Sequence, residues 1–379
     1  MMINYPGLLK LKTKQVVFQE VFPACDSGTL EQLKEMSSKR RAIEESINES
    51  SSLTEAIARE MSGGLTLRCE RDIQKLEQYL PLLENLVYHF NLVRDKPLVV
   101  RWTSDLKLRW TSALISSSIF HLNGPKYFQI NYLGFELGMV LFLYGALLRE
   151  KAHEILQTDL AQSAALFRKA AGVYQHLAHE VLPPLQLAVT VEQPPESVSS
   201  VSSFMSLFCL AEAQAVTARR AEEKGNTQSL LAKLHYGVRD FLDEALGILH
   251  SAIKECKDIS SQLVDFIVSC RMLHELKSYK YIAESLKADG KIGAAVGVLR
   301  HALTNVEKST PKVEAWRIVF KQLIDEITEL LRKCEHENDF VWHEKIPSEH
   351  ELAPPETLKI VSSIPYHPQR WERTLAFKI

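Results

Sequence analysis

The stretch of this chain that most limits its fold is residues 135–148, FELGMVLFLYGALL, which is almost wholly apolar. A helix needs about 20 such residues to cross a bilayer, so this stretch is too short to span a membrane. Gly138 and Gly145 would let neighbouring helices approach closely. The stretch is therefore predicted to form the central buried helix of a larger helical body.

The composition is that of an ordinary folded protein. The chain has 379 residues, 46% of them hydrophobic and 24% charged, with a formal net charge of −2. This leaves ample apolar material for a core, and the near-neutral charge argues against a nucleic-acid partner. The six cysteines include no CxxC pair, and the N-terminal MMINYPGLLKLKTK lacks the apolar core of a secretory signal. We therefore expect a cytoplasmic protein with free thiols.

The N-terminal third is predicted to contain short strands and helices. Residues 29–62 are polar and helix-compatible, with a break expected at 50–52. Residues 71–90 repeat apolar side chains at steps of three and four, which indicates an amphipathic helix that bends or breaks near Pro81. Four runs have the composition of strands: residues 8–11, 16–22, 98–102 and 114–122.

After residue 135 the chain is predicted to be helical almost throughout. Pro183 and Pro184 should end the first helix after the central one, and residues 186–203 should form an exposed loop. Two helices joined by residues 288–291 space small and large side chains as a tetratricopeptide hairpin does. From Asn338 on, the Pro-rich chain should wrap over the helices as an ordered loop. The other helices are expected at residues 161–182, 204–223 and 227–254 and after Pro311.

The sequence contains no recognisable catalytic motif. It has no GxSxG elbow, no P-loop and no GxGxxG. His176 and His179 lie three residues apart and could in principle share a metal, but neither a HExxH pattern nor a Cys pair accompanies them. We therefore expect no enzyme activity, no cofactor, no metal and no small-molecule substrate. An enzyme with an unrecognised site would need a cleft with converging His, Asp or Glu residues.

Several segments, taken in order, resemble the Bro domain family, the endosomal-targeting domain of the kind found in ALIX and BROX. The resemblance covers about the whole chain, and ordered segments are more specific than any single motif. The matching segments are LVVRW at 98–102, FE at 135–136 followed by VLFLYGAL, AALFRKAAGVYQHL at 164–177, LAEAQ at 210–214, LLAKL at 230–234, the helix hairpin around Gly290, and ENDFVWHEKIPSEHELAPP at 337–355.

The resemblance implies a mainly α fold: a banana-shaped helical body with tetratricopeptide-like hairpins and a small N-terminal sheet. It implies one domain over residues 1–379, with an N-terminal part at 1–125, a helical core at 126–335 and a C-terminal wrap at 336–379. It also implies an adaptor, recruited to endosomes, that binds the C-terminal amphipathic helix of an ESCRT-III subunit of the Snf type in multivesicular-body formation. Such docking needs apolar anchors that meet i, i+3 and i+4 side chains.

An ungapped alignment through LAEAQ and LLAKL places the family's groove residues on Leu230, Leu234 and Thr217. Periodicity alone makes both leucines core residues, while the resemblance favours Leu230 as the groove residue. Thr217 replaces an aromatic anchor, a loss that commonly costs about 2 kcal/mol at a hot spot. The alternative is thus a helical scaffold whose groove binds a different protein helix, with ESCRT-III binding lost. Three nearby side chains could replace the anchor: Phe204, Leu207 and Phe208.

We expect a member of the family that consists of this domain alone, because the chain ends at Ile379, and no prenylation, because it lacks a terminal Cys box. We also expect no N-terminal myristoylation, since Met2 and not a glycine follows Met1. Trp342 occupies the position of a tyrosine in relatives and is expected to be a buried anchor for the tail. A peripheral contact with the endosomal membrane would use partners or basic side chains. The candidates are Lys10, Lys12, Lys14, Lys39, Arg40 and Arg41.

Overall fold

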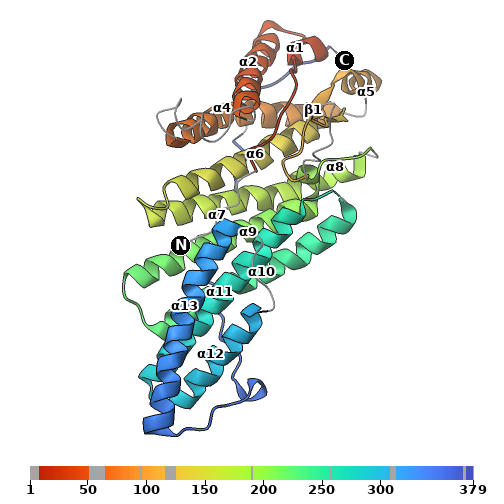
Figure 1. Ribbon diagram of the computed structural model, residues 1–379. Coiled ribbons are helices and arrows are strands. Elements are labelled where there is room, and N and C mark those ends of the chain that lie inside the picture. The colour runs from red at the N-terminus through yellow and green to blue at the C-terminus, as the bar shows by residue number, and fades with distance from the viewer. Residues whose placement is uncertain are drawn as a thin grey trace. The chain divides into compact units, whose positions relative to one another are not determined.

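Helices form most of the structure, and a two-stranded antiparallel sheet is inserted between them (Figure 1). Strands β1, Leu108–Trp110, and β2, Phe128–Ile130, pair with Arg109 opposite Gln129.

The computed structural model describes residues 8–50, 65–93, 96–115, 125–188, 191–256, 258–307, 313–369 and 373–378. The helices are α1 Phe18–Val21, α2 Ser27–Ser50, α4 Leu65–Val93, α5 Pro97–Asp105, α6 Leu133–Glu154, α7 Leu160–His176, α8 Leu182–Ala188, α9 Ser199–Glu223, α10 Gln228–Glu255, α11 Ser261–Ala288, α12 Ile292–Glu307 and α13 Glu314–Glu337.

The described chain divides into two units. Unit 1 contains Leu210–Gly247 and Ser261–Ser362, and unit 2 contains residues 8–209, Ile248–Ser260 and residues 363–378. The long helices α9 and α10 therefore contribute residues to both units. The division of residues 1–379 into three parts of one domain stays a prediction.

Helix α6 is the centre of unit 2, as the apolar stretch predicts. It lies between α4 and α7 (Figure 1), and every residue from Leu133 to Leu143 is buried. At Gly145 an added Cβ would lie 2.7 Å from the ring of Tyr174 on α7. The missing side chain thus allows the close helix approach that the sequence predicts.

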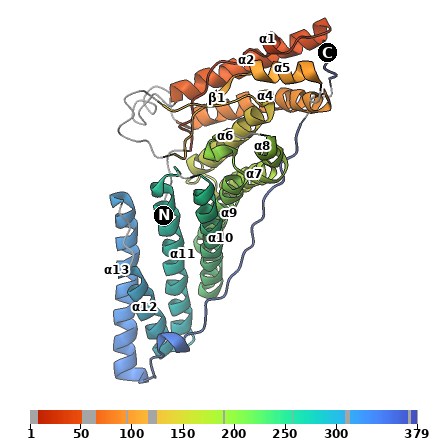
Figure 2. The same cartoon turned by 90° about the vertical axis from the view of Figure 1, so that its right-hand side faces the viewer.

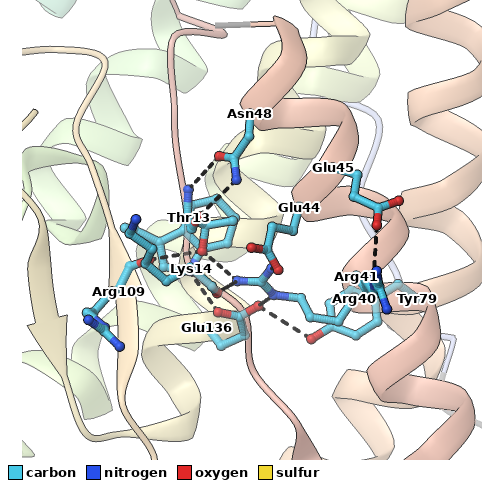
Figure 3. A network of polar contacts seen from close by, with 11 residues as sticks. Thr13, Lys14, Arg40, Arg41, Glu44, Glu45, Asn48, Tyr79, Arg109 and Glu136 are labelled. Atoms are coloured by element: carbon cyan, nitrogen blue, oxygen red, sulfur yellow. Dashed lines mark hydrogen bonds and ion pairs between the residues drawn. The ribbon is translucent and has the colours of Figure 1, made fainter. Parts of the chain in front are cut away.

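A buried polar network joins α2, α4, α6 and β1 in unit 2 (Figure 3). The carboxylate of Glu136 accepts hydrogen bonds from Nε of Arg40, from Nε1 of Trp110 at 2.7 Å and from the hydroxyl of Tyr79 at 3.4 Å. Arg40 also donates to Oγ1 of Thr13 at 2.5 Å. Arg40 and Glu136 are both fully buried. The expectation that Arg40 belongs to a basic membrane-facing surface is therefore wrong.

Unit 1 contains the tetratricopeptide-like hairpin. Helices α11, α12 and α13 pack side by side (Figure 2), and Gly290, with φ of 75°, forms the turn between the first two. The C-terminal segment, residues 343–378, follows α13, and its described residues contain one short 3₁₀ turn, Glu349–Glu351. Its residues up to Ser362 contact helices of unit 1 and the rest contact helices of unit 2. The predicted hairpin is confirmed, and the C-terminal wrap over residues 336–379 stays a prediction.

Three of the predicted strands are wrong. Residues 8–11 form no strand, and residues 16–22 contain the short helix α1. Residues 98–102 lie in helix α5, where the buried side chains Val99 and Trp102 are three residues apart, which is a helical spacing. The fourth run, 114–122, lies mostly outside the described residues; Ile115 forms an isolated bridge with Ile259.

The prolines do not end the helices as predicted. A π-helical turn, Leu177–Val181, connects α7 to α8, and Pro183 and Pro184 lie in the first turn of α8. Pro81 lies within α4, which continues past it, so the predicted break is absent and the predicted bend stays a prediction. The predicted exposed loop at 186–203 is also wrong, because Pro195–Ser197 is a buried 3₁₀ turn and α9 begins at Ser199.

Trp342 is not the buried anchor that the sequence suggests. It lies in a π-helical turn after α13 and is 50% exposed, and the two residues before it, Phe340 and Val341, are more exposed still. Asn338 is the buried residue of this turn, and its amide exchanges two hydrogen bonds with the backbone of Glu344. The amide of Asn338, rather than the indole, therefore fixes the start of the tail.

Candidate partner-binding surface

The three predicted groove residues lie on α9 and α10 within unit 1. The chain reverses between the two helices at Gly225, whose φ is 67°. Nε2 of Gln214 on α9 donates to the carbonyl of Leu234 on α10 at 3.1 Å, which places the helices next to each other. Thr217 lies one turn after Gln214 and Leu230 one turn before Leu234. Both residues therefore lie between this hydrogen bond and the turn.

The structure separates the two leucines. Leu234 is only 2% exposed and belongs to the core, whereas Leu230 is partly exposed. Thr217 is also partly exposed, and its hydroxyl donates to the carbonyl of Ala213 in its own helix at 2.9 Å. Leu230 and Thr217 can thus meet a partner, and Leu234 can only support them from below.

The possible replacements for the missing aromatic anchor are mostly inaccessible. Phe204 and Phe208 are buried and stack on each other with ring centroids 6.0 Å apart. Leu207 remains partly exposed. A buried ring cannot contact a partner without leaving the core, so neither phenylalanine can take the place of the anchor.

The C-terminal segment lies against the same pair of helices, which the sequence analysis did not foresee in this detail. Nε2 of Gln214 donates to the carbonyl of Leu358 at 2.6 Å, and the amide of Ile360 donates to Oε1 of Gln214 at 3.0 Å. The amide of Leu358 donates to the carbonyl of Lys233 at 3.1 Å. Ile360 is 53% exposed, so an apolar side chain of the tail is accessible beside Gln214.

Charged side chains hold this part of the tail on α10. Lys233 pairs with Glu356 at 2.6 Å, and Lys359 pairs with Glu244. The ammonium group of Lys359 also lies 4.5 Å from the ring centroid of Phe241. Exposed ion pairs of this kind add little stability each, so the backbone contacts of Leu358 carry most of the attachment.

A polar cluster lies under the turn end of α9 and α10. Oε1 of Glu222 on α9 accepts from Nε2 of His235 at 2.7 Å and from the hydroxyl of Tyr281 at 2.8 Å, and Nζ of Lys277 lies 3.6 Å away. Nδ1 of His235 lies 3.0 Å from Nδ1 of His274 on α11. We call Glu222, His235 and His274 the histidine cluster; it joins α9, α10 and α11.

Burial keeps the two imidazoles neutral. It lowers the pKa of His235 to about 4, against the opposing effect of the hydrogen bond to Glu222. Burial also lowers the pKa of His274 well below its ordinary value, and the charges of His235 and Lys277 add to this. For Glu222 burial alone would raise the pKa, but the hydrogen bond from His235 and the charge of Lys277 lower it far below the usual range.

Other features of the described residues do not form a second candidate site. No group of three or more His, Cys, Asp or Glu among them could hold a metal. The ring of His176 contacts the ring of Tyr366 at a tilt of 45°, and Nδ1 of His179 contacts the carbonyl of Gln175. Helix α9 is long and apolar enough to cross a membrane, but 78% of its apolar window is buried. We interpret α9 as a core helix.

Comparisons with known proteins show that this chain matches one protein family. A model of the BRO1-like domain matches residues 31–377. The Xenopus laevis programmed cell death 6-interacting protein is 28% identical over 266 residues, which are 69% of this chain but only 29% of that protein. The human BRO1 domain-containing protein BROX is 25% identical over 324 residues, 79% of this chain and 75% of that protein.

Solved structures show the same fold. The ALIX BRO1 CHMP4C complex matches with a TM-score of 0.70 and 20% identity, covering 96% of each chain. A structure described as the basis for endosomal targeting by the Bro1 domain matches with a TM-score of 0.65 and 16% identity, covering 94% of this chain and 91% of that one. The predicted fold class, mainly helical with a small sheet, is confirmed.

Proposed function

The chain belongs to the BRO1-like domain family, and from this premise we propose that it is a non-enzymatic adaptor that binds the C-terminal amphipathic helix of an ESCRT-III subunit of the Snf type. In this role it is cytoplasmic, is recruited to endosomes and acts in endosomal sorting and multivesicular-body formation. The solved BRO1 structure of ALIX in complex with CHMP4C supports a protein partner of this kind.

The observation that carries this proposal is the partial exposure of Leu230 and Thr217, which both lie between the Gln214–Leu234 hydrogen bond and the turn. A groove that receives an amphipathic helix needs a few exposed apolar anchors rather than a deep cavity. Leu230 supplies one anchor on α10, and the exposed Ile360 supplies apolar surface on the tail. Leu234 stiffens the surface from the core.

Thr217 supports a second candidate function, a scaffold whose surface binds a different protein helix. A threonine whose hydroxyl is bonded to its own helix offers one methyl group where relatives offer an aromatic ring. Aromatic side chains dominate binding hot spots. A partner helix with a larger side chain at the facing position would restore the contact.

The test is a titration of the purified protein with a labelled Snf-type ESCRT-III tail peptide. We expect a micromolar dissociation constant, about −8 kcal/mol, and loss of binding in Leu230→Asp. Leu187→Asp is the matched control, because Leu187 is 90% exposed in unit 2 and should not affect binding. Circular dichroism must show that both variants fold.

Absence of binding by the wild type would reject the ESCRT-III proposal and leave the second candidate. The next titrations would then use amphipathic helical peptides that carry a tryptophan or phenylalanine at the position facing Thr217. Equal binding by the wild type and Leu230→Asp would show that the partner uses another surface.

A further inference from the structure

The histidine cluster lies where it can control the candidate surface. Glu222 belongs to the last turn of α9, and His235 directly follows Leu234 on α10. Both side chains face α11, which supplies His274, Tyr281 and Lys277. The contacts of the cluster therefore fix the turn end of both helices, the part that displays Thr217 and Leu230, against a third helix.

The hydrogen bonds assign one proton to each imidazole. Nε2 of His235 must carry its proton, because it lies 2.7 Å from a carboxylate oxygen that can only accept. Nδ1 of His235 is then an acceptor, and Nδ1 of His274 donates to it across 3.0 Å. A gap of this length holds one hydrogen. Protonating both imidazoles would direct two N–H groups at each other and break the contact between α10 and α11.

We propose that Glu222, His235 and His274 form a proton-sensitive clamp that positions the partner-binding end of α9 and α10 on α11. The inference rests on the proposed function, since it concerns regulation of the same surface. These residues are positioning residues: they lie beneath the surface and act on a partner only through Thr217 and Leu230.

The charges around the clamp determine its response to acid. Glu222, on α9, favours an added proton, and Lys277, on α11, opposes it. Tyr281, also on α11, stacks on His235 at 5.5 Å and carries no charge. The next ion pair along α10 and α11 joins Arg239 to Glu275 at 3.5 Å. Between pH 7.5 and 5 both imidazoles stay neutral in the closed junction and gain a proton only where the junction opens.

Acid should open the clamp. In an open state each imidazole has its ordinary pKa of about 6.5, whereas the closed state keeps both neutral. Lowering the pH from 7.5 to 5 should therefore raise the equilibrium constant for opening by up to about 1000-fold, about 30-fold for each histidine. The peptide affinity should fall with it, because the open hairpin no longer holds its anchors in place.

The experiment titrates the labelled ESCRT-III tail peptide at pH 7.5 and pH 5 into the wild type and into the double variant His235→Gln, His274→Asn. Glutamine and asparagine can place a donor near Nε2 and Nδ1, respectively, and neither titrates. We expect the wild type to lose affinity by about tenfold or more and the double variant by about twofold or less. His250→Gln, an exposed histidine of α10, should behave like the wild type.

Identical pH profiles for the wild type and the double variant would overturn the clamp. Failure of the wild type to bind at pH 7.5 would reject the proposed function instead, and hydrogen exchange then tests the clamp without a partner. Exchange of the amides at residues 229–236, corrected for the intrinsic rate, should accelerate on acidification in the wild type. Unchanged protection there would overturn the clamp, and this measurement also decides the matter if the double variant does not fold.

Discussion

Each unit places a carboxylate at the centre of a polar network, but the two carboxylates have different partners. In unit 2 the carboxylate of Glu136 is fully buried and meets the guanidinium of Arg40, with Trp110 and Tyr79 as further donors (Figure 3). In unit 1 the carboxylate of Glu222 is still 23% exposed, and its buried partner is the neutral imidazole of His235. The cation of the first network is an arginine, which is always charged, whereas the imidazole of the second network can gain a charge.

The difference follows from the position of each network. An arginine keeps its charge at any pH that a folded protein experiences, so the network of unit 2 holds α2, α4, α6 and β1 together under all conditions. A histidine changes charge near neutral pH, and the histidine cluster lies directly under an accessible surface. A fixed network suits a scaffold, and a titratable cluster suits a surface whose partner must be released.

The largest effect should come from breaking the permanent network. In Arg40→Met the carboxylate of Glu136 stays buried without its cation, and we expect the free energy of unfolding to fall by about 3–5 kcal/mol. Urea denaturation measures this change. Arg41→Met is the control: Arg41 is 68% exposed in its pair with Glu45, so the loss should stay within about 0.5 kcal/mol. Equal effects of the two substitutions would contradict the role given to Arg40.

An aromatic side chain at position 217 should fit the accessible surface of unit 1 and strengthen the binding of a partner. Thr217→Phe adds an aromatic ring to the proposed partner-binding surface, and we expect tighter binding of the ESCRT-III tail peptide by about 2 kcal/mol, roughly 30-fold. Isothermal titration calorimetry on this variant and on Thr217→Val separates the ring from the loss of the hydroxyl. A weaker affinity for Thr217→Phe would favour the second candidate function.

Acid should weaken unit 1 through its histidines. The unfolded chain protonates His235 below a pH of about 6.5, but the folded protein does so only below a pKa of about 4. Stability therefore falls as the pH falls across that interval, by about 2 kcal/mol at pH 5 for this group. Arg40 adds nothing to this change: burial opposes its charge, but Glu136 raises its pKa above the ordinary value.

Urea denaturation of the wild type and His235→Gln at pH 7.5 and pH 5 measures this contribution as the difference between their pH dependences. Glu222 contributes little in this range, because its pKa is lowered in the folded protein and its ordinary value of 4.5 leaves it mostly ionised in the unfolded chain at pH 5. Equal pH dependences would show that His235 is not buried in solution.

The long, strongly periodic helices could be predicted from the sequence, and the short segments could not. The spacing of apolar residues in α6, α10 and α13 fixes one buried face over many turns. The five residues LVVRW are too short to distinguish a strand from a helix. Pro97 is compatible with either, since a proline at the first position of a helix loses no hydrogen bond.

The candidate surface was predictable only in part. The alignment of LLAKL proposes Leu230 as a groove residue, which stays a prediction, and its partial exposure depends on neighbours that are distant in sequence. The same holds for Arg40: its sequence neighbours are charged, and only the fold brings it to Glu136, 96 residues away. For Trp342 the sequence predicts burial, but the structure shows the side chain exposed. The sequence cannot show that the amide of Asn338 fixes this turn instead.

The smallest predicted effect on stability concerns the contact between the tail and α10 of unit 1. A matched control for it lies in the same helix. At Gly237 on α10 an added Cβ would lie 2.3 Å from the carbonyl oxygen of Leu358 and 2.2 Å from Nε2 of Gln214. At Gly247, in the same helix, an added Cβ meets no atom within 4 Å. Both substitutions to alanine raise the helix propensity by about 1 kcal/mol, and only the first displaces the tail.

We therefore expect Gly247→Ala to stabilise the protein by about 1 kcal/mol. Gly237→Ala should lose that gain to overpacking of about 1–3 kcal/mol and end about 1 kcal/mol less stable. Proteolysis of the tail should also accelerate in Gly237→Ala alone, because its backbone contact with α10 is lost. An equal gain of stability in both variants would show that the tail does not lie against α10. Ile360 would then not belong to the candidate surface, whereas the position of the histidine cluster would be unaffected.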